Sequence, residues 1–299
     1  MDGRHPEHQY LDLLRDLLES GSPRIDRTGV GTRAKFGASM RFDLSDGTVP
    51  IFTTKKVLWE VAAKETLWFL SGSENIRPLL QQGVRIWSAW PHKRYVEETG
   101  SECTLEEFER LIVEDEEFAN RFGNTGRAYG AQWRQWKTAD GRKIDQVANC
   151  LDLLRNDPYS RRILFHAWNV GEVDGMILSP CHLLYQLGVE DGRLNMLMFQ
   201  RSADIFIGVP FNLWSSALLL RMFAQQVGLG PGILQWFGGD VHLYENHVEA
   251  ARVQLSREPR PWPKLHIRRR PDSIDGYVIG DFAVEGYDPH GFLKAPVAV

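Results

Sequence analysis

The spacing of apolar residues along the chain predicts a protein that mixes helices and strands. Apolar residues recur at helical spacing in several segments, and 212–228 is the most apolar of them, so we expect it in the core. The other predicted helices cover 8–21, 58–72, 145–157 and 242–258. Alternating patterns predict strands at 161–170, 182–206 and 232–244, the second of them a hairpin that turns at Glu190-Asp191-Gly192.

Two stretches near the N-terminus are less regular. The segment 24–47, rich in Gly and Thr, predicts a polar loop followed by strands with a turn at Asp46-Gly47. The segment 75–87 predicts a short helical turn and a loop. We interpret the chain as one α+β domain over 1–299.

The segment 91–123 differs from its surroundings because it is acidic. It predicts one surface helix that begins after Thr104, a residue suited to an N-cap. We interpret the segment as a small insertion on the main fold.

The charge, the apolar runs and the cysteine count of the chain argue against several classes of function. The 299 residues carry a net charge of −4, so a general nucleic-acid-binding coat is not expected. The N-terminus lacks the layout of a signal peptide, and no apolar run is long enough to span a bilayer. Three cysteines form neither a disulfide framework nor a paired metal motif, so we expect a cytoplasmic protein without a metal.

Arginines next to hydroxyl-bearing residues indicate an anion site. They occur in "DRTG" (Arg27), in "SRR" (Arg161 and Arg162) and in "QRS" (Arg201 beside Ser202). The rigid guanidinium fork suits phosphate oxygens, although a single arginine is more often part of a surface ion pair. No Walker loop and no dinucleotide-binding glycine motif is present, so ATP and NAD are not indicated.

Cys181, in "LSPCHLLYQ", has two interpretations. A lone cysteine in an apolar run is usually a buried structural thiol. It becomes a nucleophile when nearby positive charge favours the thiolate, which the arginines would supply if the fold brings them close. Neighbours on a strand point to opposite faces, so we do not expect His182 to be the direct base.

Other polar residues in apolar surroundings have both structural and functional interpretations. Glu65 is either a solvated edge residue or a buried carboxylate that is paired or used. Asn212 is either the N-cap of the apolar helix or an amide that recognises the edge of a base. Asp240, His242 and Tyr244, in "GGDVHLY", are either ordinary core or edge residues or a group that binds sugar hydroxyls.

Together these segments resemble the thymidylate synthase family, folate-dependent enzymes that methylate dUMP at C5. The resemblance runs from about Tyr10 to Val299 and is carried by "DRTGVGT", "TTKK", "ETLWFLSGSENI", "YGAQWR", "DPYSRRILFHAWNVGE", "SPCH", "FQRSADIFIGVPFN", "GGDVHLYENH", "QLSREPRPWPKL" and "YDPHGFLKAPVAV". It implies a large mixed sheet flanked by helices, with two such sheets packed back to back in a homodimer.

The resemblance also implies a role for each matching residue. Cys181 would add to C6 of the pyrimidine, which prepares C5 to accept a one-carbon unit from 5,10-methylenetetrahydrofolate. Glu65, His182 and Tyr129 would assist proton transfer, and Asn212 would pair with N3 and O4 of uracil. The remaining nucleotide contacts would come from Arg27, Arg201, Ser202, Asp204, His242 and Tyr244, with Arg161 and Arg162 donated by the second subunit. The folate would contact Lys55, Ile86, Trp87, Trp90, Asp204, Ile207, Gly208, Phe211 and Ala298, the last in a tail that closes over the ligands.

Several positions depart from the family pattern. They are Leu58, Ser88, Ala89, His166, Ser179, Trp214 and Ser216. They leave a second reaction open, in which water replaces hydride and a hydroxymethyl group forms on dUMP, dCMP or CMP. Asn212, Trp87 and the complete tail favour uracil and methylation. A protein that binds nucleotides without catalysis is the third hypothesis, against which Cys181 and Glu65 count.

Overall fold

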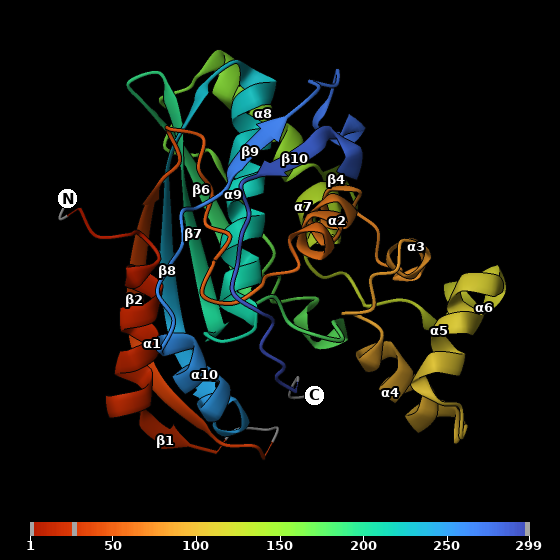
Figure 1. Cartoon of the computed structure of the whole chain (residues 1–299). Coiled ribbons are helices and arrows are strands. Elements are labelled where there is room, and N and C mark those ends of the chain that lie inside the picture. The colour runs from red at the N-terminus through yellow and green to blue at the C-terminus, as the bar shows by residue number, and fades with distance from the viewer. Residues whose placement is uncertain (1–2, 26–28, 297–299) are drawn as a thin grey trace.

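The computed structural model, which describes residues 3–25 and 29–296, is built on one six-stranded sheet (Figure 1). The strands follow the order β1-β2-β8-β7-β6-β5. They are β1 (Ser22–Arg24), β2 (Thr32–Asp43), β8 (Gly230–Tyr244), β7 (Arg193–Asp204), β6 (His182–Glu190) and β5 (Leu164–His166). Among the strands of residues 3–25 and 29–296, only β7 and β8 pair in parallel. The predicted combination of helices with a large mixed sheet is therefore confirmed.

The hairpin between β6 and β7 turns where the sequence predicted. Asp191 and Gly192 have φ angles of 48° and 71°. Two successive positive φ values match the right-handed twist of the flanking strands, and an Asp-Gly pair tolerates them. The hairpin sets β7 in register, so that Arg201 and Ser202 fall near its C-terminal end.

Helices cover one face of the sheet, and further helices stand to one side of it (Figure 1). The helices are α1 (His8–Ser20), α2 (Trp59–Leu70), α3 (Arg77–Gln81), α4 (Ala89–Thr99), α5 (Leu105–Glu114), α6 (Glu116–Phe122), α7 (Gly130–Gln135), α8 (Gln146–Asn156), α9 (Gly208–Val227) and α10 (Val248–Leu255). Helix α9 is the most buried of them, lying between the sheet and α2 as its apolar sequence predicts (Figure 1). Within residues 3–25 and 29–296, no helix has the length and apolarity needed to cross a membrane.

Two small antiparallel sheets complete the described fold. One pairs β3 (Trp136–Lys137) with β4 (Lys143–Ile144), and the other pairs β9 (Lys264–Ile267) with β10 (Phe282–Glu285). Helices α4, α5 and α6 stand to one side of the molecule, away from the large sheet (Figure 1). Thr104 caps α5 in a capping box with Glu107, which confirms the predicted helix start. The prediction of a single helix in 91–123 is wrong, because most of α4 and all of α6 also lie in that segment.

The opposite face of the large sheet is partly apolar, and none of the described helices covers it (Figure 1). Leu184 of β6 lies beside Phe199 of β7, which lies beside Phe237 of β8. Phe237 is 39% exposed, and Phe36 on β2 is 83% exposed. Rows of large apolar side chains on an open sheet face are typical of a surface that another protein covers.

Candidate active site

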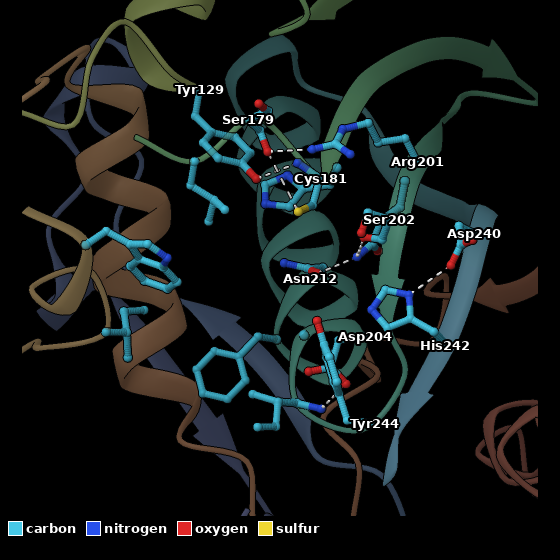
Figure 2. A pocket seen from close by; sticks show the side chains of 18 of the residues that line it. Tyr129, Ser179, Cys181, Arg201, Ser202, Asp204, Asn212, Asp240, His242 and Tyr244 are labelled. Atoms are coloured by element: carbon cyan, nitrogen blue, oxygen red, sulfur yellow. Dashed lines mark hydrogen bonds and ion pairs between the residues drawn. The ribbon is translucent and has the colours of Figure 1, made fainter. Parts of the chain in front are cut away.

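The structure gathers most of the predicted site residues around one cavity of about 920 Å³. It lies where the end of β7, the start of α9, the loop before β6 and α2 meet (Figure 2). The predicted residues that line it are Glu65, Ile86, Trp87, Trp90, Tyr129, Cys181, His182, Arg201, Ser202, Asp204, Ile207, Gly208, Phe211, Asn212, His242 and Tyr244. The volume falls in the upper part of the range for small-molecule sites.

Three predicted residues in the described part of the chain do not line the cavity, and two others, Arg27 and Ala298, lie outside the described residues. Arg161 and Arg162 are exposed just before β5, at the edge of the sheet. Lys55 is buried instead, where its Nζ donates to the carbonyl of Phe206, and burial lowers its pKa to about 7.

Cys181 sits at the end of the loop that leads into β6, and it is only partly buried. Its backbone N–H donates to the hydroxyl of Tyr129 at 2.7 Å, and its carbonyl accepts from the N–H of Arg201 at 2.8 Å (Figure 2). These bonds fix the backbone on both sides of the thiol. Cys181 is therefore not the fully buried thiol of the structural interpretation, whereas Cys150 is buried, and burial raises the pKa of Cys150 to about 12.

Arg201 brings a fixed positive charge to the loop that carries Cys181. Its Nε donates to the carbonyl of Pro180 at 2.8 Å and its Nη2 to that of Ser179 at 2.9 Å. Its guanidinium carbon lies 5.0 Å from the centre of the Trp168 ring. Its Nη1 makes no hydrogen bond to any residue in the described part of the chain. The N–H groups of Nη1 thus remain for an anion, and a cation beside a thiol is the setting in which thiolates form.

Glu65 projects from α2 into the cavity and is almost fully buried. Its Oε1 accepts from Nε1 of Trp87 at 2.6 Å. Burial raises the pKa of the carboxyl to about 7, and the Trp87 bond acts in the opposite direction because it stabilises the anion. The solvated-edge interpretation is wrong. A carboxyl with this pKa can hold or release a proton near neutral pH.

His182 lines the same cavity as Cys181, contrary to what strict strand alternation predicts. Cys181 precedes β6, and the register of β6 shifts between His182 and Leu184, so the alternation rule fails here. Burial lowers the pKa of His182 to about 3, which leaves the imidazole neutral. Its Nδ1 lies 2.8 Å from the hydroxyl of Tyr185. A neutral ring supports the view that His182 is not a cationic partner of the thiol.

Tyr129 is held in a strained conformation next to Cys181. Its φ is +35°, a value that a bulky residue rarely adopts. The next residue must be a glycine, because a Cβ on Gly130 would lie 2.1 Å from the carbonyl oxygen of Phe69. The Tyr129 ring stacks on Phe69 at 4.6 Å, and burial raises its pKa, so the hydroxyl stays protonated.

Asn212 is the fifth residue of α9 and not its N-cap, so the N-cap interpretation is wrong. Its Oδ1 accepts from Nε2 of Gln200 at 2.9 Å, and Oε1 of Gln200 accepts from Nε1 of Trp236 at 3.0 Å. Because the indole only donates, this chain of bonds fixes which way both amides face. The second lone pair of Oδ1 and the Nδ2 donors can then recognise a ligand edge with one donor and one acceptor (Figure 2).

Sequence reasoning missed Gln200 as a functional residue. It is 1% exposed and follows Leu194, Met196 and Met198 on the inner face of β7. A polar side chain at the fourth position of an apolar, core-facing row was the available signal.

A second polar group lies at the other end of the cavity. Nδ1 of His242 lies 3.0 Å from Oδ1 of Asp240, whose Oδ2 pairs with Nη1 of Arg24 at 2.6 Å. Asp240 thereby orients His242, beside Tyr244 (Figure 2). Arg24 also lines the cavity, although no motif in the sequence singles it out.

A flat apolar wall occupies the remaining side. Trp87 and Trp90 lie with ring centres 5.8 Å apart, and Ile86 and Phe211 extend the wall. Oδ1 of Asp204 accepts from the backbone N–H groups of Phe206 and Ile207, which shapes the turn into α9. The C-terminal tail reaches this region, where Nε2 of His247 donates to the carbonyl of Pro296 at 2.7 Å.

Most departures from the family pattern fall outside the cavity. Trp214 is fully buried against Trp59, and Ser216 donates to the carbonyl of Asn212 within α9. Leu58 is exposed. Of the departing positions, only Ser179 lines the cavity.

Comparison with known proteins agrees with this geometry. The family model described as thymidylate synthase matches residues 8–299. A thymidylate synthase of Rhodopseudomonas palustris (strain BisA53) is 58% identical over 99% of this chain and 100% of its own length. Those of Cereibacter sphaeroides (strain ATCC 17029) and Sinorhizobium fredii (strain NBRC 101917 / NGR234) are 58% and 56% identical, each over 99% of both chains. The chain belongs to the thymidylate synthase family.

Proposed function

We propose that the protein converts dUMP to dTMP, with 5,10-methylenetetrahydrofolate as the donor. The observation that carries this proposal is the position of Cys181 in the same cavity as Asn212, whose amide is fixed by Gln200. A nucleophile and a group that recognises a base edge thus face one ligand site. Membership of the family over nearly the whole chain supports the same reaction.

The nucleotide is proposed to lie with its phosphate at Arg201 and Ser202. Nη1 of Arg201, which bonds no other residue that the structure describes, and the hydroxyl of Ser202 are suited to phosphate oxygens. Asn212 accepts from N3–H of uracil and donates to O4, while His242 and Tyr244 hold the 3′-hydroxyl at the far end. Cytosine lacks a proton on N3 and carries an amino group at C4, so it would face Asn212 with the opposite pattern.

Cys181 acts as the nucleophile in this proposal. Its thiolate adds to C6 of the pyrimidine, and the electron pair moves onto the C5, C4 and O4 system. Tyr129 fixes the backbone of Cys181, so the sulfur is preorganised for the attack. Glu65, with its pKa near 7, exchanges the proton at the O4 side, and neutral His182 serves as a hydrogen-bonding group beside it.

The residues on the apolar wall fit a reduced folate. Trp87, Trp90 and Phe211 present aromatic faces to the cavity, which suits stacking of a flat bicyclic ring, and the cavity is large enough for a nucleotide with a second ring beside it. The folate supplies the one-carbon unit and the hydride when it is bound. The wall excludes water from C5 and orients the donor. Ala298, in the C-terminal tail, and Lys55, which is buried against Phe206, remain proposed contacts of the folate.

Hydride transfer is favoured over the addition of water. The choice between the two depends on water access, and the wall that controls access keeps both tryptophans. Because all departing positions except Ser179 lie outside the cavity, they give no route for water to the reacting carbon. Methylation is therefore the product chemistry we propose.

We further propose that the protein works as a homodimer in the cytoplasm. The uncovered sheet face with Leu184, Phe199 and Phe237 is suited to packing against its copy. Arg161 and Arg162 lie exposed at the edge of that face, where they can reach the phosphate site of a second subunit. A catalytic thiol at Cys181 must stay reduced, which a reducing compartment ensures.

The product assay tests this function. The protein is incubated with methylenetetrahydrofolate and, separately, dUMP, dCMP and CMP. We expect dihydrofolate to form in step with dTMP from dUMP alone. A product heavier by formaldehyde, formed with tetrahydrofolate, would refute methylation, and turnover of a cytidine nucleotide would refute the proposed role of Asn212.

A further inference from the structure

The acidic helix α5 contains one carboxylate that is buried. Glu109 is 6% exposed and follows Phe108 on the inner side of the helix. The neighbouring acids Glu106, Glu107 and Glu114 are exposed, as expected for a solvated helix face. A buried carboxylate is costly unless it is paired, so its contacts define its purpose.

Glu109 holds both ends of one turn. Its Oε2 lies 3.0 Å from Nη1 of Arg85, and its Oε1 accepts from the hydroxyl of Ser88. The same hydroxyl lies 2.8 Å from the carbonyl of Arg85. A hydroxyl has one proton, and a carboxylate is the stronger acceptor, so the bond to Glu109 dominates. The backbone N–H of Ser88 also donates to the carbonyl of Arg85 at 3.2 Å, which closes the turn.

The two middle residues of this turn are Ile86 and Trp87, and both line the cavity. Trp87 in turn donates to Glu65, the carboxyl whose pKa is near 7. A contact path therefore runs from α5, which lies to one side of the molecule, to the wall and to a group proposed to move protons. No acidic residue occurs between Glu74 and Glu97, so the chain has no local carboxylate to hold this turn.

We propose that Glu109 is a positioning residue for the folate side of the cavity. Through its contacts with Arg85 and Ser88, it holds Ile86 and Trp87 in their positions on the apolar wall of the cavity. This inference rests on the proposed function, because it assigns the wall to the folate. It gives helix α5 a part in the reaction without contact with either ligand.

The test compares Glu109→Ala with Glu106→Ala, which removes an exposed carboxylate from the same helix. We expect Glu109→Ala to raise KM for methylenetetrahydrofolate about tenfold or more, since small misplacements of positioning groups have effects of this size. The dissociation constant for dUMP should stay within about twofold, because the nucleotide contacts lie elsewhere. Glu106→Ala should resemble the wild type in both measurements.

Two further variants separate positioning from simple destabilisation. Ser88→Asp in the Glu109→Ala background returns a carboxylate to the turn beside Arg85 and should restore KM for the folate. Glu109→Gln keeps an acceptor for Ser88 but loses the charge for Arg85, so it should lie between the wild type and Glu109→Ala. A KM for folate equal to that of Glu106→Ala would overturn the proposal, as would a parallel loss of dUMP binding without rescue.

Quenching of tryptophan fluorescence by dihydrofolate measures folate binding without turnover. It therefore tests the role of Glu109 separately from the proposed reaction. If the wild type made no dTMP but still bound the folate, the proposed function would fail, and the same variants compared by quenching would decide the role of Glu109. If the wild type bound no folate, both would fail.

Discussion

Replacement of Trp87 by phenylalanine tests how the protein sets the pKa of Glu65. The indole N–H donates to Oε1 of Glu65 at 2.6 Å, and this bond stabilises the carboxylate. Phenylalanine keeps an aromatic ring in the wall but removes the donor. The remaining influence, burial, favours the protonated form, so the pKa of Glu65 should rise above its present value of about 7.

The size of the change follows from the bond that is lost. A hydrogen bond to a charged group is worth about 1.5–3 kcal/mol. A change of one in a pKa corresponds to about 1.4 kcal/mol, so the rise is about 1–2. Water in the cavity can replace part of the bond, and we expect a value near the lower end. Whichever form of Glu65 is active, the limb of the pH profile that it governs moves to higher pH.

The assay follows the carboxyl stretch of Glu65 by infrared difference spectroscopy over pH, with Glu65→Gln to assign the band. The matched control is Trp90→Phe, because Nε1 of Trp90 has no hydrogen-bond partner in the described part of the chain. The band should titrate at higher pH in Trp87→Phe and at the wild-type pH in Trp90→Phe. Equal titration of all three proteins would refute the reasoning.

Three other predictions concern buried polar groups. The pKa of Glu65 is about 7 in the folded state against an ordinary value of 4.5, so its contribution to stability is present below pH 4.5 and is lost as pH rises through 7. Relative to wild type, Glu65→Gln should therefore gain up to about 3 kcal/mol of unfolding free energy between pH 4.5 and pH 8, measured by urea denaturation. Glu7 is fully buried and accepts from the N–H and hydroxyl groups of Thr53 and Thr54, so Glu7→Ala should cost about 3–5 kcal/mol in the same assay, and a loss under about 1 kcal/mol would contradict the network. Tyr185→Phe removes the hydroxyl beside Nδ1 of His182, so it should change the ¹⁵N chemical shifts that report the tautomer of the His182 ring. It should also lower kcat more than it raises KM for dUMP. Unchanged shifts would exclude Tyr185 from orienting the ring.

Elements whose signals are local in the sequence were predictable. The hairpin at Asp191-Gly192 and the capped start of α5 at Thr104 depend only on neighbouring residues, and the structure confirms both. Helix α9 shows the limit of such signals. It begins at Gly208 rather than at Asn212, because Asp204 on the preceding strand accepts the backbone N–H groups of Phe206 and Ile207.

The sequence was enough to predict most of the residues that form the site, but not their burial or their contacts. Glu65 and Trp87 are 22 residues apart, and Ser88 and Glu109 are 21 apart. Such pairs meet only through the packing of α2, α4 and α5, which no periodicity encodes. The sequence therefore left the burial of Glu65 undecided, although that burial sets its pKa.

The rule that side chains alternate along a strand gave a wrong prediction for Cys181 and His182, and the reason is physical. The rule separates Cys181 from His182, yet both line the cavity, because Cys181 lies in the loop before β6 and the strand has a register shift at its start. Irregular backbone at a strand end re-aims side chains, and it is common next to functional sites. Arg161 and Arg162 are a different case, since their proposed role depends on a second subunit.

Covalent addition of Cys181 to C6 of the nucleotide underlies every step of the proposed reaction. The intact mass of the protein after incubation with 5-fluoro-dUMP and methylenetetrahydrofolate tests this addition most directly. We expect a mass increase equal to both molecules, located at Cys181 by peptide mapping and absent from Cys181→Ser. No mass increase in the wild type, or the same increase in Cys181→Ser, would contradict it.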